Sequence, residues 1–307
     1  MHITVSVIIV NYNTIQLTRS CIKSIIQYTK DVLYEIILVD NNSTECNAEI
    51  LKKEFPEIVF IQSFINLGFA GGNNLGLAKV NGDYVLLLNS DTELVNDAVS
   101  LALKAMQKDI RIGALSARLI YPDGRMQPVA GRFPSLKTEW YELLRVYKFE
   151  TEDKKRIRLH GDLWDYTNST ETDWLWGAFL LIPASVIKQF PNQKLHEDFF
   201  MYVEDVQWCY FIKHTLKLKV VYCAEPIVIH HIGGSSITKD PEANFSAKIL
   251  PNQYKFLLIA HGYVYTYLYY FVKTLHYYTL KGDLNYYVKN HEHGCGKRNS
   301  DICYNSD

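Results

Sequence analysis

The chain has 307 residues, of which 48% are hydrophobic and 21% charged, and its formal net charge is −1. This composition is typical of a globular protein with a hydrophobic core, and the near-zero charge gives no overall attraction to nucleic acid. The six cysteines are scattered without a Cys-x-x-Cys pair, which argues against a disulfide framework or a structural zinc site. Because these cysteines favour a reducing cytosol, we expect a cytoplasmic protein, and a first strand that begins at Val5 leaves no room for a signal peptide.

The first 120 residues alternate between short apolar runs and stretches with helical periodicity. Strands are expected at 5–10, 35–39, 59–65, 85–88 and 112–120, and helices between them at 15–28, 46–55, 71–80 and 97–108. Thr14 is the expected N-cap of the first helix, and Pro56 ends the second. This alternation indicates parallel βαβ units with right-handed crossovers, and therefore an α/β fold.

The alternation stops after residue 120, where Tyr121–Gly124 has the residues of a hairpin turn. Later in the chain we expect helices at 140–147 and 205–216, an exposed charged segment at 150–158, and strands at 174–182, 219–222 and 227–231. Because no linker precedes residue 245, we expect one domain over 1–245, an aromatic-rich helical extension over 246–280 and a flexible tail over 281–307.

The extension is rich in tyrosine between residues 254 and 280, and His261, Lys273 and His276 interrupt its apolar residues. It lacks the roughly 18 to 20 uninterrupted apolar residues of a membrane-spanning helix. Aromatic residues mixed with Lys and His suit a peripheral membrane contact, a homodimer contact through 246–280, or packing against the main domain. The sequence leaves these alternatives open.

Polar clusters follow each of the first four predicted strands, and the carboxyl ends of parallel strands meet at the edge where open α/β sheets bind ligands. Tyr12 is placed to stack on a base, and Asp40 to accept from a base N–H or a ribose hydroxyl. The glycine-rich segment 68–74 opens a helix, whose N-terminus favours phosphate or a polar sugar. The nucleotide-binding candidates are Asn11, Tyr12, Asn13, Asp40, Asn66, Gly68, Asn73, Asn89 and Ser90.

Two further clusters carry groups suited to catalysis. Asp91 follows a buried strand and offers an oxygen ligand to a divalent cation, although it could also cap a turn. His230 and His231 end another apolar strand, as metal ligands, phosphate contacts or structural residues. Glu204-Asp205 follows an aromatic run whose packing would raise a carboxyl pKa and suit a general base, although acids at a helix start also serve as caps.

The order of these segments resembles the family 2 glycosyltransferases, in particular the bacterial branch with rhamnosyltransferases that build cell-surface polysaccharides. The matching segments are 5–13, 39–43, 66–74, 88–92, 176–179, 204–206 and 230–236. The resemblance runs from about residue 5 to 240. It implies the GT-A fold, a Rossmann-like, mixed but mostly parallel sheet flanked by helices, here with a C-terminal helical extension.

The resemblance also implies roles for the nucleotide and metal candidates. Asp40 would bind the base of the donor. Asp91 would be the metal-binding acid of the Asp-x-Asp motif, in which this chain has Asn89 at the first position, and the cofactor would be Mg²⁺ or Mn²⁺. His230 matches the C-terminal histidine ligand, with His231 as the alternative.

For the reacting groups, the resemblance implies that Asp205 is the catalytic base, that Glu204 supports it or touches the acceptor, and that Trp176, Gly177 and Ala178 line the sugar pocket. One base without a second carboxylate nucleophile predicts a single displacement with inversion. The implied substrates are a nucleotide-sugar, with dTDP or UDP as the favoured nucleotides, and a glycan or polyprenyl-linked acceptor. We expect a cytoplasmic location, and the aromatic extension leaves open a peripheral attachment to the inner face of the cell membrane.

Two other functions fit the same kind of sheet. A sugar nucleotidyltransferase would need a basic, glycine-rich loop after the first strand, and Asn11-Tyr12-Asn13-Thr14 lacks one. A non-catalytic nucleotide-sugar-binding or scaffold subunit would not need to keep Asp40, Asp91, Asp205 and His230 together. The chain also has neither a Gly-x-Gly-x-x-Gly motif after its first strand nor a Gly-Lys-Ser/Thr sequence, which argues against a dinucleotide-binding fold and a P-loop.

Overall fold

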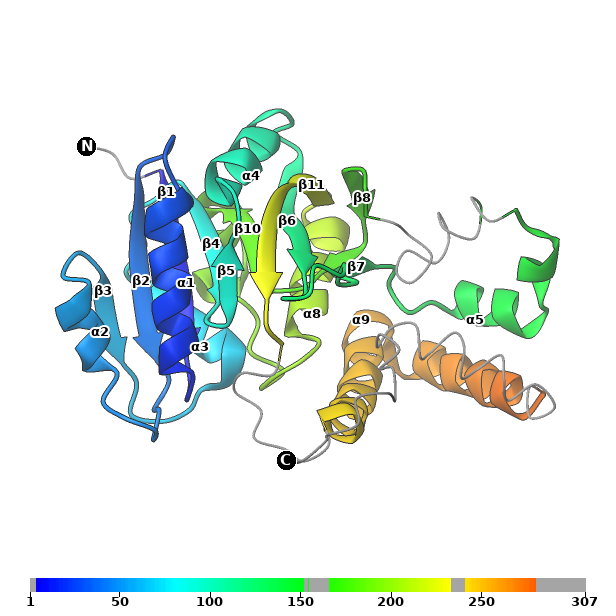
Figure 1. Cartoon of the computed structure of the whole chain (residues 1–307). Coiled ribbons are helices and arrows are strands. Elements are labelled where there is room, and N and C mark those ends of the chain that lie inside the picture. Colours follow the sequence, from blue (N-terminus) through cyan, green and yellow to red (C-terminus); the bar gives the residue numbers. More distant parts are fainter. Residues whose placement is uncertain (1–3, 152–153, 155–165, 233–240, 280–307) are drawn as a thin grey trace, which may run out of the picture.

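The computed structural model of the chain describes residues 4–151, 154, 166–232 and 241–279. These residues form a mixed β-sheet flanked by helices, as Figure 1 shows. The predicted tail at 281–307, most of the charged segment 150–158 and the Gly-Gly-Ser-Ser stretch after residue 232 lie outside the described residues.

The main sheet has nine strands in the order β3-β2-β1-β4-β10-β6-β11-β5, with β8 paired to β11. Its strands are β1 (Val5–Asn11), β2 (Tyr34–Asp40), β3 (Val59–Gln62), β4 (Tyr84–Asn89), β5 (Thr92–Leu94), β6 (Ile112–Ile120), β8 (Thr170–Thr172), β10 (Phe179–Pro183) and β11 (Lys219–His230). A small second sheet pairs β7 (Ala130–Gly131) with β9 (Trp174–Leu175).

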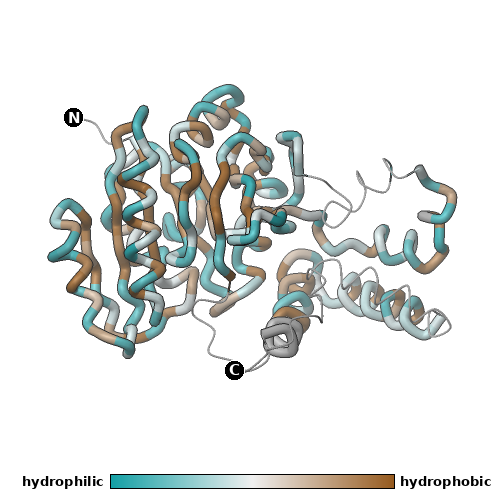
Figure 2. The backbone as a smooth tube through the Cα atoms, in the orientation of Figure 1, coloured by the Kyte–Doolittle hydropathy of each residue, from teal (hydrophilic) through white to brown (hydrophobic). Residues whose placement is uncertain are grey.

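Strands β1, β2, β3, β4, β6 and β11 all run in one direction, whereas β5, β8 and β10 run antiparallel to their neighbours. The carboxyl ends of β1, β2, β3, β4 and β11 therefore lie along one edge, together with the start of β10. The middle strands are continuously apolar because helices cover the sheet; residues 85–88 of β4, for example, are all buried. Figure 2 shows this core as hydrophobic strands inside a more polar shell.

The helices are α1 (Ile15–Tyr28), α2 (Glu49–Glu54), α3 (Gly68–Leu77), α4 (Ala98–Gln107), α5 (Leu136–Leu143), α7 (Ala184–Ile187), α8 (Glu204–Tyr210) and α9 (Pro241–Thr279), with a π-helical turn at Phe211–Thr215 that continues α8. Short 3-10 turns lie at Val146–Phe149 and Pro191–Gln193. The hairpin turn predicted at Tyr121–Gly124 is present, with Gly124 N–H donating to the Tyr121 carbonyl at 2.9 Å.

Several element predictions were wrong in detail. The strand expected at 174–182 is divided into β9 and β10, and the two strands expected at 219–222 and 227–231 are one strand, β11, with an irregularity between Tyr222 and Ile227. Helix α3 begins three residues before the expected start, at Gly68. Thr14 precedes α1 but makes no capping hydrogen bond; the Glu45 carboxylate accepts from the Ile15 N–H at 2.6 Å instead.

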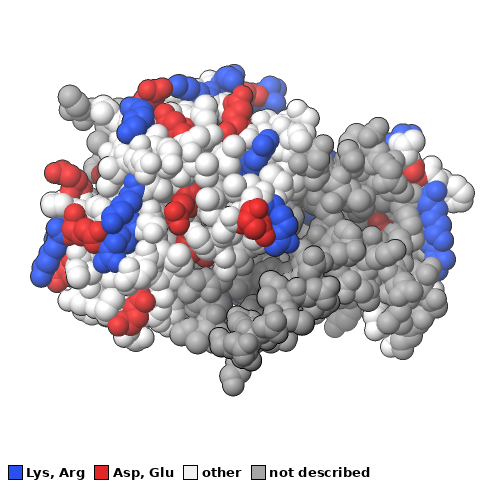
Figure 3. Space-filling model, in the orientation of Figure 1, with Lys and Arg blue, Asp and Glu red and all other residues white. Residues whose placement is uncertain are grey.

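Helix α9 consists of two helical segments that meet at Gly262, whose φ is 77°. Its second segment packs beside α5, as Figure 1 shows, and the Tyr265 hydroxyl accepts from the Leu136 N–H at 2.8 Å. None of the helices described here is long and apolar enough to cross a membrane. On the face drawn in Figure 3, basic and acidic side chains are interspersed rather than gathered by sign.

Candidate active site

The ends of β1, β2 and β3 are joined by a buried carboxylate. Asp40 is 2% exposed, and its Oδ1 accepts from Asn11 Nδ2 at 2.7 Å and Ser43 Oγ at 2.6 Å. Its Oδ2 accepts from Gln62 Nε2 at 2.7 Å and from the Ser43 N–H at 3.1 Å. Both oxygens are therefore engaged within the protein, and a base N–H reaches Asp40 only if the exposed Gln62 side chain moves aside.

The other polar residues at this end hold the loops together. Asn13, with φ of 55°, accepts from the backbone N–H groups of Thr44 at 2.7 Å and Glu45 at 3.2 Å through Oδ1. Tyr12 beside it is half-buried. On the β4 side, Ser90 Oγ lies 2.8 Å from Thr14 Oγ1, so the hydroxyl of the expected helix cap joins two strand ends instead.

The segment before α3 is also organised by internal hydrogen bonds. Asn66 Oδ1 accepts from the Gly68 N–H at 2.9 Å and from Asn41 Nδ2 at 3.0 Å. A Cβ at Gly68 would lie 2.2 Å from the Phe200 carbonyl oxygen, so glycine is required there for contact with the loop before α8. Asn73 donates to the Phe69 carbonyl at 2.9 Å, and its buried Oδ1 has no hydrogen-bond partner among the described residues.

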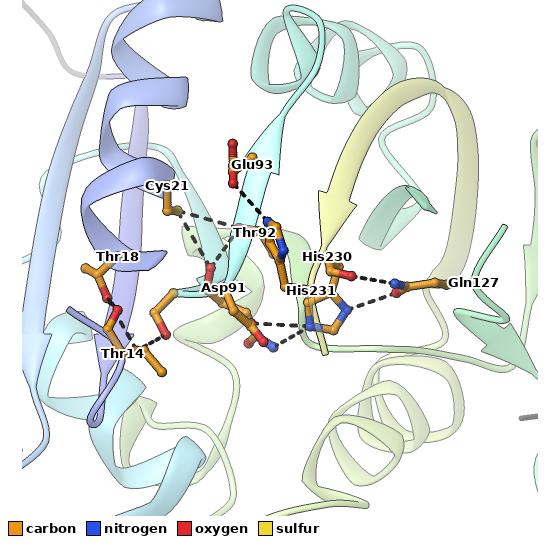
Figure 4. A network of polar contacts seen from close by, with 11 residues as sticks. Thr14, Thr18, Cys21, Asp91, Thr92, Glu93, Gln127, His230 and His231 are labelled. Carbon is orange, nitrogen blue, oxygen red and sulfur yellow. Dashed lines mark hydrogen bonds and ion pairs between the residues drawn. The ribbon is translucent and has the colours of Figure 1, made fainter. Parts of the chain in front are cut away.

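A histidine and a carboxylate meet where β11 ends beside β5. Nε2 of His230 lies 3.4 Å from Asp91 Oδ1 and 3.3 Å from Asn89 Nδ2 (Figure 4). On its other side, Nδ1 lies 3.0 Å from Gln127 Oε1, and Gln127 Nε2 donates to the His230 carbonyl at 2.6 Å. Because the Gln127 amide must turn its NH₂ toward that carbonyl, its oxygen faces Nδ1, which therefore carries the proton.

His231 belongs to a different contact. Its Nε2 lies 2.9 Å from Glu93 Oε1, and its backbone N–H donates to the Asp91 carbonyl at 2.9 Å. In Figure 4 its ring points toward Glu93, while the ring of His230 points toward Asp91. Of the two histidines proposed as ligands, the structure brings His230 to the carboxylate. Nearby Cys21 is buried, which raises the pKa of its thiol to about 12 and leaves it unreactive at neutral pH.

The described residues contain no group of three or more His, Cys, Asp and Glu side chains that could hold a metal ion by themselves. Asp91 and His230 nevertheless fit a shared cation. Their facing atoms, 3.4 Å apart, are both hydrogen-bond acceptors when His230 is neutral. Two ligands of an octahedral cation at about 2.1 Å each are about 3 Å apart, which a small movement satisfies.

The segment between β9 and β10 connects Asp91 and His230 to a second carboxylate site, which Glu204 and Asp205 form. The Trp176 ring lies edge-on to the His230 ring, with centroids 6.4 Å apart. The Gly177 N–H donates to Asp205 Oδ2 at 3.0 Å, and the Ala178 carbonyl accepts from the N–H of Asn89, the last residue of β4, at 3.0 Å. Three consecutive residues thus contact the histidine, the second carboxylate site and the end of β4.

The carboxylates of Glu204 and Asp205 stand at the start of α8. Asp205 Oδ1 accepts from the Val206 N–H at 2.9 Å. Burial raises the pKa of Asp205 to about 6, against the lowering effect of the backbone N–H groups of Gly177 and Val206. Burial and the neighbouring Asp205 charge raise the pKa of Glu204 well above its usual range, and its Oε2 has no hydrogen-bond partner among the residues described. Asp205 is therefore the carboxylate of the pair that ionises near neutral pH.

Gln127 was missed by the sequence analysis. It follows the turn at 121–124, in a stretch without strand periodicity, and its position depends on the bridge between Ile120 and Met126 and on its N–H bond to the Leu119 carbonyl at 3.0 Å. No local pattern marks such a residue, because its partner is more than a hundred positions away.

Comparison with known proteins agrees with this architecture. The sequence model described as "Glycosyl transferase family 2" matches residues 6–167. An N-acetylglucosaminyl-diphospho-decaprenol L-rhamnosyltransferase of Mycobacterium tuberculosis is 24% identical over 237 residues, which cover 69% of this chain and 71% of that protein. A hexosyltransferase of low-salt glycan biosynthesis from Haloferax volcanii is 26% identical over 241 residues, covering 74% of this chain and 66% of that protein.

Solved structures share the fold at lower identity. GalNAc-T7 with UDP, GalNAc and Mn²⁺ superposes with a TM-score of 0.59 and 17% identity over 83% of this chain and 48% of that one. Residues 1–349 of S. aureus TarS superpose with a TM-score of 0.51 and 17% identity over 84% of this chain and 66% of that one. The fold is that of the GT-A glycosyltransferases, as the sequence predicted. The chain belongs to glycosyl transferase family 2 and is a glycosyltransferase.

Proposed function

We propose that this enzyme transfers a sugar, with inversion, from a nucleotide-diphosphate donor to a hydroxyl of a glycan or lipid-linked saccharide in cell-surface polysaccharide synthesis. The observation that carries the proposal is the link from Asp205 through Gly177 and Trp176 to His230 and Asp91. This link supports a single pocket, with the cation site on one side and the general base on the other.

Asp205 is the proposed general base. It removes the proton of the acceptor hydroxyl as that oxygen bonds to the anomeric carbon, while the bond from that carbon to the diphosphate breaks on the opposite face. Its raised pKa makes it a stronger base than an ordinary aspartate and still leaves it ionised at neutral pH. Glu204 is proposed to stay protonated beside it and to donate a hydrogen bond to the acceptor, since its Oε2 is buried and unpaired among the described residues.

Asp91 and His230 are proposed to hold Mg²⁺ or Mn²⁺. Bound there, the cation would offset the charge of the diphosphate leaving group. Asn89 supplies an amide where the family pattern has a first acid, so Asp91 is the proposed carboxylate anchor. We expect Asp91→Asn to lower Mn²⁺ affinity, measured by calorimetry with UDP or dTDP present, and to lower turnover in parallel. Full activity in a chelator would contradict this role.

The acceptor is proposed to be lipid-linked. The relative from M. tuberculosis is named for a decaprenol-linked acceptor, which supports this choice. Helix α9 also exposes a stripe of apolar side chains: Tyr263, Val264, Tyr267, Leu268 and Phe271. Residues 249–279 include no acidic residue, which favours contact with an anionic membrane. We propose that 1–245 is the catalytic domain and that 246–280 attaches it to the inner face of the cell membrane.

The experiment that tests the function uses purified protein and a panel of dTDP-, UDP- and GDP-sugars with Mn²⁺. Thermal shift identifies the donor, because a bound ligand stabilises the folded state by mass action. Release of nucleoside diphosphate then reports turnover. We expect Asp205→Asn to abolish turnover and leave the thermal shift by the donor nearly unchanged. Turnover close to that of the wild type in this variant would remove Asp205 from the mechanism.

A further inference from the structure

The loop that precedes the proposed base has a costly backbone conformation. We call residues 198–203 the base loop, since Glu204 and Asp205 follow it directly. Tyr202 and Val203 have φ values of 67° and 77°, in the left-handed region. For a β-branched residue such as Val203 this is a true outlier, and such conformations persist only where surrounding contacts hold them.

Helix α9 supplies contacts to this loop from its first segment. Asn252 Nδ2 donates to the carbonyl oxygens of Met201 at 2.9 Å and Tyr202 at 3.0 Å. Only the NH₂ group of an amide can face two carbonyls, so the orientation of Asn252 is settled. One turn further on, Lys255 Nζ donates to the Asp198 carbonyl and lies 5.1 Å from the centre of the Phe199 ring.

The base loop is also held by α3. The Phe69 N–H donates to the Phe200 carbonyl at 3.0 Å, and the close approach at Gly68 makes this contact feasible. The carbonyls at 198, 200, 201 and 202 thus all accept hydrogen bonds from α3 or α9. These carbonyls are not satisfied by hydrogen bonds within a helix or a strand, because residues 198–203 form neither.

Helix α9 also packs against the far end of the helix that carries the base. Phe256 and Leu257 are buried, and the Phe256 ring lies 5.5 Å from that of Tyr210, edge to face. The Tyr210 hydroxyl donates to the Ala260 carbonyl at 3.3 Å. Helix α8 therefore touches α9 at its C-terminal end, while Asn252 holds the loop before its N-terminal end.

We propose that Asn252 is a positioning residue for the reaction: it holds the strained end of the base loop and so sets the direction of the Asp205 carboxylate. This inference rests on the proposed role of Asp205 as the base. Its consequence is that the helical extension belongs to the catalytic unit, in addition to any surface it offers to a membrane. Asn252 touches no reacting atom and acts through Tyr202, Val203 and the start of α8.

The decisive variant is Asn252→Asp, which keeps the size of the side chain but replaces the donor with an oxygen facing two carbonyls. Gln253→Glu, one residue along α9, is the matched control for the added charge. Amide hydrogen exchange of the full-length protein should increase about tenfold or more in peptides covering 199–205, with β4 unchanged. Wild-type exchange in that segment would overturn the proposal. Should Asn252→Asp fail to fold, Asn252→Ala removes the same donor and carries the same test.

Kinetics separates positioning from a structural role. Using the donor that the panel identifies, Asn252→Asp should lower kcat about tenfold or more and leave KM for that donor within about twofold, because a displaced base affects the chemical step. An unchanged kcat together with faster exchange would also overturn the proposal. Asp205→Asn is measured alongside. If it stays active, the proposed base is wrong, while the exchange data still show whether Asn252 holds the loop.

Discussion

The backbone N–H of Gly177 donates to Asp205 Oδ2 at 3.0 Å, and its neighbour Trp176 lies edge-on to His230. The segment between β9 and β10 therefore connects the proposed base with the proposed cation site. A side chain at residue 177 is excluded by a third neighbour, since a Cβ there would lie 2.8 Å from the Phe69 ring. The position of the proposed base therefore depends on a residue without a side chain.

Gly177→Ala should therefore lower turnover about tenfold or more, because the new methyl group displaces Phe69 or the N–H that orients Asp205. Turnover and thermal melting are measured together. The control is Gly124→Ala, at a turn with φ of 85° where an added Cβ meets nothing within 4 Å. That variant should lose stability through backbone strain and keep its turnover, and equal losses of turnover in both would contradict the prediction.

The pH dependence of transfer should follow the ionisation of Asp205. Its pKa of about 6 predicts that kcat/KM rises about tenfold per unit below pH 6 and levels off above pH 7. A profile that stays level down to pH 5 would exclude a base with this pKa.

The raised pKa of Asp205 makes the stability of the fold fall with pH over the range in which activity rises. An ordinary aspartate ionises near pH 4, so between pH 4 and about 6 the folded chain keeps a proton that the unfolded chain has released. The Asp205 contribution to stability is therefore lost as pH rises through this window. Asp205→Asn should lack that loss, which denaturant unfolding at pH 5 and pH 7 measures against the wild type.

Gln127 is predicted to tune the cation site through His230. Its oxygen accepts from Nδ1, which leaves the Nε2 lone pair facing Asp91. Removing such a partner typically weakens metal binding about 10- to 100-fold. Gln127→Leu should do so for Mn²⁺, measured by calorimetry with UDP present. His231→Gln is the control, since His231 contacts Glu93 instead, and it should bind Mn²⁺ as the wild type does.

Periodicity was sufficient to predict the first half of the sheet. The apolar runs that became β1, β2 and β4 are buried on both faces. Burial on both faces requires a continuous apolar sequence, so the sequence pattern indicates a strand inside the sheet. The same reasoning joined 174–182 into one strand, because Trp176, Gly177 and Ala178 continue the apolar run. Between β9 and β10 these residues instead contact Asp205 and His230, which no local pattern records.

The sequence predicted which strand ends form the candidate site. It predicted fewer of the contacts between the side chains there. Asp91 and His230 were expected together and lie together, because β11 pairs with the β5 segment that follows Asp91. Asn252 could not be anticipated from the sequence. It stands in a helix whose composition left membrane contact, dimer contact and packing against the main domain all open. Its own role comes from two carbonyls about fifty residues earlier in the chain.

The exposed stripe of α9 should bind anionic membranes. Tyr267 and Phe271 are 69% and 64% exposed, one turn apart on the second segment, and two glutamates there would oppose insertion into an anionic interface. The full-length wild type should sediment with phosphatidylglycerol-rich vesicles, and the variant with Tyr267→Glu and Phe271→Glu should lose this binding about tenfold or more. Ile110→Glu, at a site that is 96% exposed on another part of the surface, should sediment normally. If the wild type stays in the supernatant and elutes as a dimer that the double substitution dissociates, the stripe is a subunit interface, and α9 brings two active sites together instead of bringing one to a membrane.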